Sequence, residues 1–402
     1  MKNNLRIKLI SSFFTELNLL TEYVVLHHIE KIYDVDDDID FLVNIDLQEM
    51  LLFIKKFTKS NNLCLLNYYM IDVGTYRFDI VYYNDNSLEK IELDCACKSK
   101  GNDLLSIQSS LLLKNRILVN INKSEFYKVS NENEIELYIK KKAYKNTDIL
   151  SYSNYFKSLN NEITEKVIID QYTRWNKYFK SNLFKIKFKI NKIYLLTERL
   201  FHKQSLTISF LGPDGSGKST VINKINKYPL YINNYYFHLK PIITKKSSDD
   251  MVTDPHGYAL YSPLKSYIKL MYFICQYSFG WIKNICRLKI KSSLIIFDRY
   301  FDDMLVDNRR YRYGGSIVVA KIARFFIPKP DLYFILTTDA KVIYERKQEV
   351  PFKELERQIE GYRALADEKR YFNIDVNCTP EEIVKEITKI IMKYKNNEIK
   401  ES

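Results

Sequence analysis

The stretch from Gly212 to Thr220, GPDGSGKST, fits the pattern G-x-x-x-x-G-K-[ST]. Glycines let a backbone wrap round phosphate groups without a Cβ in the way, and successive N–H groups supply positive potential. In such a loop Lys218 is expected to reach the β- and γ-phosphates of a nucleoside triphosphate, and Ser219 to hold Mg²⁺. The residues expected to form this phosphate cradle are Gly212, Asp214, Gly215, Ser216, Gly217, Lys218, Ser219 and Thr220.

A second polar group, Asp298-Arg299, follows the short apolar run 294–297. In an open α/β sheet, ligands bind at the carboxyl ends of the strands. We therefore expect Asp298 beside the phosphate loop, where its carboxylate can coordinate Mg²⁺ through water. Arg299 is expected to hold an acceptor phosphate with its planar, two-pronged guanidinium.

A third group of carboxylates lies in the first half of the chain. Asp38 and Asp40 are two residues apart on an expected strand, so both should point to one face, and a later strand carries Asp94. Such carboxylates could hold a divalent cation and a triphosphate. The alternative is an acidic turn that leads into an ordinary strand.

Local patterns predict the elements that must position these groups. The β-branched run 206–211 predicts a buried strand before the glycine loop, and the helical spacing of Val221, Ile222 and Ile225 predicts a helix after it. This strand, loop and helix are the context that the motif requires.

In the first half, residues 1–32 are expected to be mainly helical, with Val24 on the apolar face. We also expect a helix at 47–57 and a strand at 77–83. The run 135–139 is interpreted as a strand. Lysines alternate with apolar residues over 184–192; this could indicate a nucleic-acid contact, but we favour a solvated connector and no nucleic-acid partner.

Composition limits the class of protein. The chain has 402 residues, 46% of them hydrophobic, with a net charge of +13 and a pI near 9.1, so we expect a globular protein of two or three domains. The positive charge suits phosphate-bearing ligands, nucleic acid or an anionic membrane surface, without choosing among them. Cys95 and Cys97 are interpreted as two buried thiols on one strand face rather than a metal site.

Two features bear on cellular location. The segment 1–10 lacks the apolar core of a signal peptide, and nothing indicates a disulfide scaffold, so we expect a cytoplasmic protein. The apolar stretch 264–288 has an uncharged run of 13 residues, short of the ~20 needed to span a bilayer. A buried helix is the favoured interpretation, and an interfacial membrane helix is the alternative.

As a set, the second-half residues resemble the thymidylate kinase family of P-loop kinases over about 205–395. The loop 212–220 and the Asp298-Arg299-Tyr300 triplet match its motifs, and 330–336 matches the strand that follows "PD" in that family. Arg346 occupies the position of the family's lid arginine, and we expect it at a strand-to-helix transition. Lys347 is a second candidate for the lid role. The resemblance implies ATP and Mg²⁺ as cofactors and transfer of the γ-phosphate to a nucleoside monophosphate, dTMP by default.

The acceptor side departs from the family pattern. The family's R-E-P-G segment is replaced by 237–241, and its A-Y-Q-G segment by the charged stretch 302–313. The chain resembles a divergent branch that is often associated with surface-polysaccharide loci. A sugar or glycan end is therefore an alternative acceptor, and a nucleotide-gated regulatory module is a further alternative. A homodimer is left open.

Residues 20–110 resemble the nucleotidyltransferase fold of the polymerase-β superfamily. That family has a Gly-Ser turn before its paired carboxylates, whereas 27–33 contain neither Gly nor Ser. We expect an α/β protein with three parts: an α+β nucleotidyltransferase-like domain at 1–150, degenerate in catalysis; a helical, basic connector at 151–203; and a P-loop kinase at 204–402 with a parallel sheet flanked by helices.

Overall fold

The computed structural model describes residues 4–98, 109–201, 204–242 and 258–401. The chain divides into two compact units. The first unit comprises Met1–His202 together with Lys395–Ser402, and the second comprises Lys203–Tyr394. Each unit is described by itself. The sequence also predicts a loop in the polar segment that ends at Asp254, and residues 243–257 lie outside the described residues.

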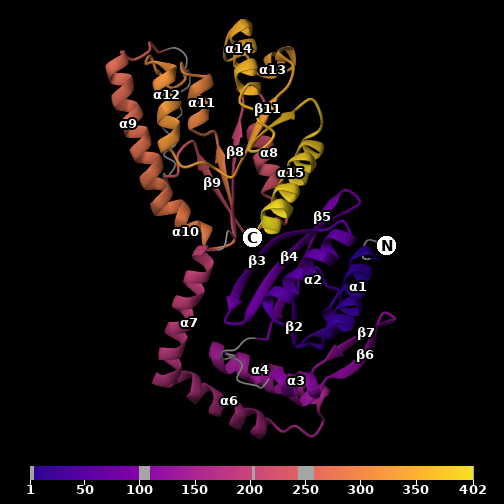
Figure 1. Cartoon of the computed structure of the whole chain (residues 1–402). Coiled ribbons are helices and arrows are strands. Elements are labelled where there is room, and N and C mark those ends of the chain that lie inside the picture. The colour runs from indigo at the N-terminus through magenta and orange to yellow at the C-terminus, as the bar shows by residue number, and fades with distance from the viewer. Residues whose placement is uncertain (1–3, 99–108, 202–203, 243–257, 402) are drawn as a thin grey trace. The chain divides into compact units, whose positions relative to one another are not determined.

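The first unit is built on a seven-stranded mixed sheet in the order β3-β4-β5-β2-β1-β7-β6 (Figure 1). β2 runs parallel to β5, and β1 runs parallel to β7, while the other neighbours are antiparallel. Its aromatic core, around Phe13, Phe14 and Phe41, holds the first helices against the sheet. The strands are β1 (Tyr23–Val25), β2 (Ile39–Val43), β3 (Cys64–Asp72), β4 (Thr75–Asn84), β5 (Ser87–Ala96), β6 (Ile117–Ile121) and β7 (Ser124–Lys128).

Most helices of the first unit form two groups. The helices α1 (Asn4–Leu20) and α2 (Leu47–Ser60) contribute to the aromatic core, and α2 begins with a capping box at Asp46. A second, smaller cluster packs around Ile139, Phe156 and Ile168. The remaining helices are α3 (Ser109–Lys114), α4 (Asn131–Lys145), α5 (Ser153–Leu159), α6 (Glu165–Lys180) and α7 (Asn182–Phe201), with short 3₁₀ turns at Ile29–Lys31 and Leu150–Tyr152.

One secondary-structure prediction in this unit is wrong, and another holds only in part. The predicted strand 135–139 lies inside α4, because Ser130 caps a helix whose buried positions extend to Ala143. The predicted helix at 1–32 ends at Leu20, and Val24 is in β1, where it pairs with Leu42. In both places tertiary pairing or a cap outweighs a local apolar pattern of only a few residues.

The second unit contains a five-stranded sheet in the order β12-β11-β8-β10-β9, and every neighbouring pair is parallel. This mixed α/β architecture is consistent with the expected P-loop kinase fold. The strands are β8 (Leu206–Leu211), β9 (Asn233–His238), β10 (Ser293–Asp298), β11 (Leu332–Thr337) and β12 (Tyr371–Asp375). Every residue of β8, β10 and β11 is buried, as expected for central parallel strands covered on both faces.

Helices flank this sheet on two sides, with α9 and α11 on one side and α8 and α15 on the other (Figure 1). They are α8 (Lys218–Ile225), α9 (Pro263–Gly280), α10 (Cys286–Lys289), α11 (Phe301–Val306), α12 (Ile317–Ala323), α13 (Ala340–Arg346), α14 (Phe352–Arg363) and α15 (Pro380–Glu401). A π-helical turn at Trp281–Ile285 joins α9 to α10, and a 3₁₀ turn at Arg324–Phe326 follows α12. Among the helices within the described ranges, none combines the length and the apolar character needed to cross a bilayer.

Candidate functional site

The glycine loop connects β8 to α8, and its backbone requires glycine at specific positions. Gly212 has a φ of 139°, and a Cβ there would lie 2.4 Å from the carbonyl oxygen of Leu336. Gly217 has a φ of 83° and occupies the N-cap position of α8. Any other residue at Gly212 would therefore clash with the neighbouring strand, so the observed path of the loop requires glycine at this position.

The side chain of Lys218 folds back into this loop and is buried. Its Nζ donates to the carbonyl oxygens of Gly212 at 2.8 Å and Pro213 at 2.7 Å, and to Ser216 Oγ at 3.3 Å. Burial, with the nearby positive charge of Arg299, lowers the pKa of Lys218 to about 8. A buried ammonium that is held mainly by carbonyl dipoles gains strongly from a phosphate ligand, because the ligand supplies the missing negative charge.

Asp298 ends β10 directly beside the loop. β10 runs parallel to β8, with Asp298 opposite Phe210, two residues before the first glycine. The Asp298 carboxylate is buried and accepts a hydrogen bond from Tyr236 Oη at 3.0 Å. The exposed hydroxyl of Ser219 stands in the first turn of α8.

A hydroxyl and a carboxylate at this end of the sheet form an oxygen-only donor set that suits Mg²⁺, which keeps most of its waters. In the part of the chain that the structure describes, no group of three or more His, Cys, Asp or Glu side chains is arranged to hold a metal ion. The thiols of Cys95 and Cys97 are buried with their sulfur atoms 3.8 Å apart.

Arg299 is buried at the same end of the sheet and is held by two carboxylates. Its Nη1 donates to Asp303 Oδ2 at 2.7 Å, and its Nη2 bonds Asp214 of the glycine loop. Arg310 also donates to Asp214, so two arginines meet one loop carboxylate. Burial opposes the charge of Arg299, but Asp303 and other neighbours raise its pKa well above the ordinary value, so Arg299 is a fixed cation.

Asp303 is the centre of a fully buried network that orients Arg299. It accepts from Tyr311 Oη at 2.8 Å and also from Tyr362 Oη. Burial raises the pKa of this carboxyl, but the charge of Arg299 and the hydrogen bonds outweigh burial and lower it, so Asp303 stays ionised. Sequence analysis did not identify Asp303, Arg310 or Tyr362, although the first two lie in the charged stretch 302–313 that it noted.

The predicted lid residues lie at the end of α13. Arg346 is the last residue of that helix rather than the start of one, and its Nη2 donates to the backbone oxygen of Val376 at 3.2 Å. Lys347 is closer to the loop, since a Cβ on Gly215 would lie 3.1 Å from Lys347 Cβ. The loop carboxylate Asp214 also shares a hydrogen bond with Glu349, and that bond raises the pKa of Glu349.

The structure brings Asp38, Asp40 and Asp94 together in the first unit, but Arg77 and His27 already pair with these carboxylates. Asp40 lies beside Asp94 in the parallel β2–β5 pair, and Arg77 lies directly opposite Asp94 in the antiparallel β4–β5 pair. The Arg77 guanidinium donates to both oxygens of Asp94 at 2.6 Å and to Asp38 Oδ2 at 2.5 Å. The remaining carboxylate, Asp40, lies 2.9 Å from Nε2 of His27.

The electrostatics of this cluster follow from the pairing. Burial raises the pKa of Asp94 to about 6 even though Arg77 acts to lower it. For Asp40, burial also acts to raise the pKa, but the hydrogen bond with His27 and nearby cations outweigh it and lower the pKa. A divalent cation held by both Asp94 and Asp38 Oδ2 would have to displace Arg77, and Asp40 Oδ2 is already paired with His27. The arrangement therefore does not favour the two-metal site that the spacing suggested.

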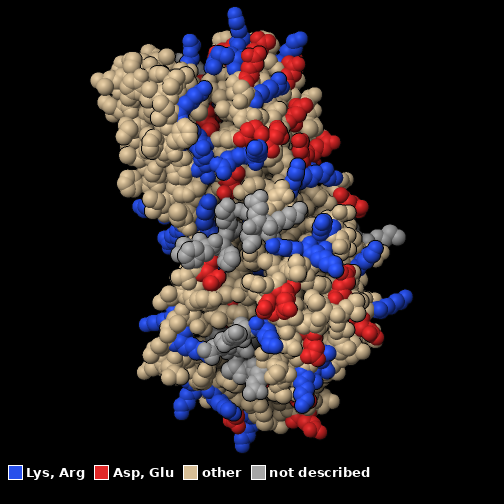
Figure 2. Space-filling view, in the orientation of Figure 1, with Lys and Arg blue, Asp and Glu red and all other residues tan. Residues whose placement is uncertain are grey.

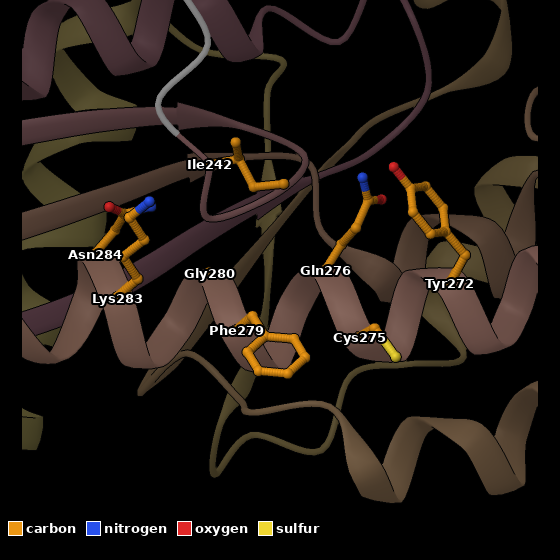
Figure 3. A pocket seen from close by; sticks show the side chains of 8 residues that line it. All are labelled: Ile242, Tyr272, Cys275, Gln276, Phe279, Gly280, Lys283 and Asn284. Carbon is orange, nitrogen blue, oxygen red and sulfur yellow. The ribbon is translucent and has the colours of Figure 1, made fainter.

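The segment that replaces the family's R-E-P-G motif carries a lysine rather than an arginine. Lys240 lies over the ring of Phe273, with Nζ 4.3 Å from the centroid, and burial lowers its pKa to about 8. A cavity of about 560 Å³ lies on the neighbouring α9 and the following π-helical turn, and its lining residues do not include the glycine loop (Figure 3). They are Ile242, Tyr272, Cys275, Gln276, Phe279, Gly280, Lys283 and Asn284.

Comparison with known proteins identifies relatives of part of the chain. A probable thymidylate kinase of Methanosarcina barkeri is 28% identical over 208 residues, which cover 46% of this chain and 96% of that protein. A thymidylate kinase of Staphylococcus epidermidis is 24% identical over 209 residues, 47% of this chain and 98% of that protein. The chain is thus homologous to thymidylate kinases over less than half of its length.

Among solved structures, the thymidylate kinase of Ehrlichia chaffeensis matches with 20% sequence identity and a TM-score of 0.33, covering 46% of this chain and 98% of that one. No protein-family model matches the sequence.

Proposed function

We propose that the chain is an ATP-dependent phosphotransferase that moves the γ-phosphate to a nucleoside monophosphate. One observation carries the proposal: the complete glycine loop holds the buried ammonium of Lys218 beside Asp298 at the adjacent strand end. The homology to thymidylate kinases supports a nucleoside monophosphate as the acceptor class, with dTMP as the first candidate.

The donor side follows from the loop. Its backbone N–H groups, with those in the first turn of α8, bind the phosphates, and Lys218 leaves its carbonyl partners to neutralise the β- and γ-phosphates. The Ser219 hydroxyl and, through water, the Asp298 carboxylate hold Mg²⁺, which when bound neutralises charge that develops on the phosphates. Tyr236 keeps the Asp298 carboxylate in place.

The acceptor side follows from the two arginines on Asp214. In the structure Arg299 and Arg310 both bond this carboxylate. A phosphate monoester is negatively charged and can present two oxygens to a guanidinium, as a carboxylate does. It can therefore replace Asp214 as the partner of both arginines. We propose that the acceptor phosphate is held in this way, with Asp303 keeping the buried Arg299 in the productive orientation.

Arg346 and Lys347 are the proposed lid cations. Lys347 already packs beside Gly215, whereas Arg346 must leave the Val376 carbonyl to reach a transferred phosphoryl group. A cation at that point would stabilise charge that develops in the transition state. The C-terminal end of α13 must therefore move during the proposed catalytic cycle.

The test is phosphoryl transfer from γ-labelled ATP with Mg²⁺ to a panel of nucleoside monophosphates, using the full chain. We expect a labelled nucleoside diphosphate, with dTMP among the accepted substrates, and no product from Lys218→Ala. Release of labelled phosphate without any labelled nucleotide would instead indicate a nucleotide-gated module. Equal product from the wild type and Lys218→Ala would remove the loop from the reaction.

A further inference from the structure

The segment that follows β9 holds a lysine in a fixed place beside α9. Lys240 stands between two residues whose backbone oxygens are bonded by side chains of α9 and its π-helical turn. Tyr277 Oη donates to Leu239 O at 2.8 Å, and Asn284 Nδ2 donates to Pro241 O at 2.8 Å. Leu239 has a φ of 62°, in the left-handed region that a leucine rarely adopts. Packing thus holds a strained backbone in place around Lys240, and such strain gathers at functional sites.

Lys240 is one of three cations that lie on aromatic rings at this point. Its Nζ lies 4.3 Å from the ring centroid of Phe273, and Lys269 Nζ lies 5.5 Å from the same centroid. Lys269 Nζ is also 5.1 Å from the ring centroid of Tyr261, and the Arg312 guanidinium is 4.2 Å from it. We call Lys240, Lys269 and Arg312 the α9 cation cluster; all three are partly exposed. The rings hold these cations but carry no net charge, so the cluster keeps its positive potential.

The segments around the cluster supply no negative charge. None of 233–242, 258–297 and 308–330 contains Asp or Glu. The ion pairs that link described residues of the second unit involve other cations, among them Arg299 and Arg310. Figure 2 shows Lys and Arg side chains gathered alongside α9 on the face of the second unit that it presents. The cluster is therefore set up to attract an anion from outside the protein.

The electrostatics of the cluster agree with this geometry. Burial, with the charge of Lys269, lowers the pKa of Lys240 to about 8. Burial, with the charge of Arg312, also lowers the pKa of Lys269. Each cation is therefore less stable because of its neighbour, and a bound anion would remove this repulsion.

Tyr311 connects the cluster to the proposed acceptor site. It directly follows Arg310 in the chain, and its Oη donates to Asp303 at 2.8 Å, the carboxylate that holds Arg299. Its backbone oxygen accepts from Lys269 Nζ at 2.5 Å. A molecule whose phosphate lies on the two arginines can therefore place another of its groups at the cluster.

We propose that the α9 cation cluster binds a second anionic group of the acceptor, a phosphate or a carboxylate, in addition to the phosphate that receives the γ-phosphate of ATP. This inference rests on the proposed function, because it takes the acceptor phosphate to lie on Arg299 and Arg310. The preferred acceptor is then a nucleotide with two anionic groups. dTMP, whose base is uncharged, would be accepted but not preferred.

The experiment compares acceptors in two pairs, using the full chain, γ-labelled ATP and Mg²⁺. Thymidine 3′,5′-bisphosphate is paired with dTMP and adds a phosphate, while orotidine 5′-monophosphate is paired with uridine 5′-monophosphate and adds a carboxylate. In at least one pair, kcat/KM for the doubly anionic acceptor should be at least roughly 10-fold higher, as expected for charge-assisted hydrogen bonds. This advantage should shrink as salt is raised. The pair that shows it identifies the second group as phosphate or carboxylate.

Two variants and a matched control locate the effect. Lys240→Met and Lys269→Met each remove one charge and keep an unbranched side chain. Each should lower kcat/KM for the doubly anionic acceptor roughly 10-fold more than for its partner. Lys291→Met removes an exposed lysine before the opposite end of β10 and should keep the wild-type preference. Thermal unfolding is recorded for every variant, and either lysine variant that unfolds like the wild type is sufficient for the test.

Two results would overturn the inference and leave the proposed function standing. The first is label transfer to both members of each pair with equal kcat/KM. The second is a preference for the doubly anionic acceptor that persists in both Lys240→Met and Lys269→Met, which would assign it to other residues. Release of labelled phosphate without transfer to any of the four nucleotides would instead overturn the proposed function, and this inference with it.

Discussion

The two units each gather carboxylates and cations at a sheet, but they pair them differently. In the second unit the loop cation Lys218 is held by backbone carbonyls and a hydroxyl, and Asp298 accepts from a tyrosine. In the first unit Arg77 bonds both Asp94 and Asp38, and His27 pairs with Asp40.

This difference has a chemical consequence. A charge held by neutral dipoles keeps much of its attraction for an incoming ion, whereas a charge in a close ion pair gives up that partner before it binds another. We therefore propose that Lys218 and Asp298 receive a nucleotide and its metal ion. The carboxylates around Arg77 are arranged to stabilise the first unit, and we propose that this unit has no nucleotidyl transfer of its own.

The largest expected effect comes from removing the loop cation. Lys218→Ala should lower phosphoryl transfer by roughly 10³-fold or more, because the charge on the transferred phosphoryl group loses a fixed counter-charge. Lys227→Ala, a lysine exposed beyond the end of α8, is the matched control and should retain wild-type kcat. If Lys218→Ala turned over near the wild-type rate, Lys218 would have no role in transfer, and the contrast drawn between the two units would be wrong.

Removing the cation of the other cluster should act on stability. Arg77→Met leaves the buried Asp94 without its partner and should lower the free energy of unfolding of the first unit by about 3–5 kcal/mol. Urea denaturation of the full chain, followed at its first transition, measures the loss. Adding Asp94→Asn to Arg77→Met should recover part of it.

A loss below about 1 kcal/mol in Arg77→Met would show that the ion pairs contribute little. The carboxylates would then be available for another ligand, and the contrast between the two units would fail.

The acceptor arginines give a smaller, kinetic effect. Arg310 is partly exposed and bonds Asp214, so Arg310→Lys should raise the acceptor KM about 10-fold with little change in the KM for ATP. Arg299→Lys should raise the acceptor KM and also lower kcat, since Arg299 is buried against Asp303. Steady-state kinetics with each substrate varied in turn distinguish the two patterns, and a change in the KM for ATP alone would argue against the assignment.

The smallest expected effect is on the pH dependence of ATP binding. The pKa of Lys218 is about 8 without ligand, below its ordinary value because of burial, and bound phosphates must raise it. As pH rises above about 8, the free protein loses the charge first, so ATP affinity should fall by up to about tenfold per pH unit. Calorimetry in buffers of different ionisation enthalpy should detect proton uptake on ATP binding near that pH, and its absence would place the pKa elsewhere.

The sequence predicts the elements around the glycine loop well because their signals are local. The run 206–211 coincides with β8, and Asp298 ends β10, because each strand is a short, mostly apolar run; Gly212 follows the first and Asp298 closes the second. The partners of Arg299 could not be predicted in the same way. Tyr362 reaches Asp303 across 59 residues of chain, and nothing in its neighbourhood indicates that contact.

The first unit is harder to predict because its site depends on strand register. Asp38, Asp40 and Asp94 were identified from spacing, but Arg77 was seen only as the start of a strand. Its position opposite Asp94 follows from the β4–β5 pairing, which no local pattern fixes. The nucleotidyltransferase resemblance of this unit, and its degeneracy, remain predictions.

One measurement tests the central claim that the chain has a single site for nucleotide chemistry. The full chain is given Mg²⁺, nucleoside monophosphates and ATP labelled either at the γ- or at the α-phosphate, in parallel with Lys218→Ala and Asp38→Asn. We predict that the γ-label moves to a nucleoside monophosphate and only Lys218→Ala abolishes this, while the α-label moves to no acceptor. Transfer of the α-label that survives in Lys218→Ala and disappears in Asp38→Asn would contradict the account, because it would make the first unit a second enzyme.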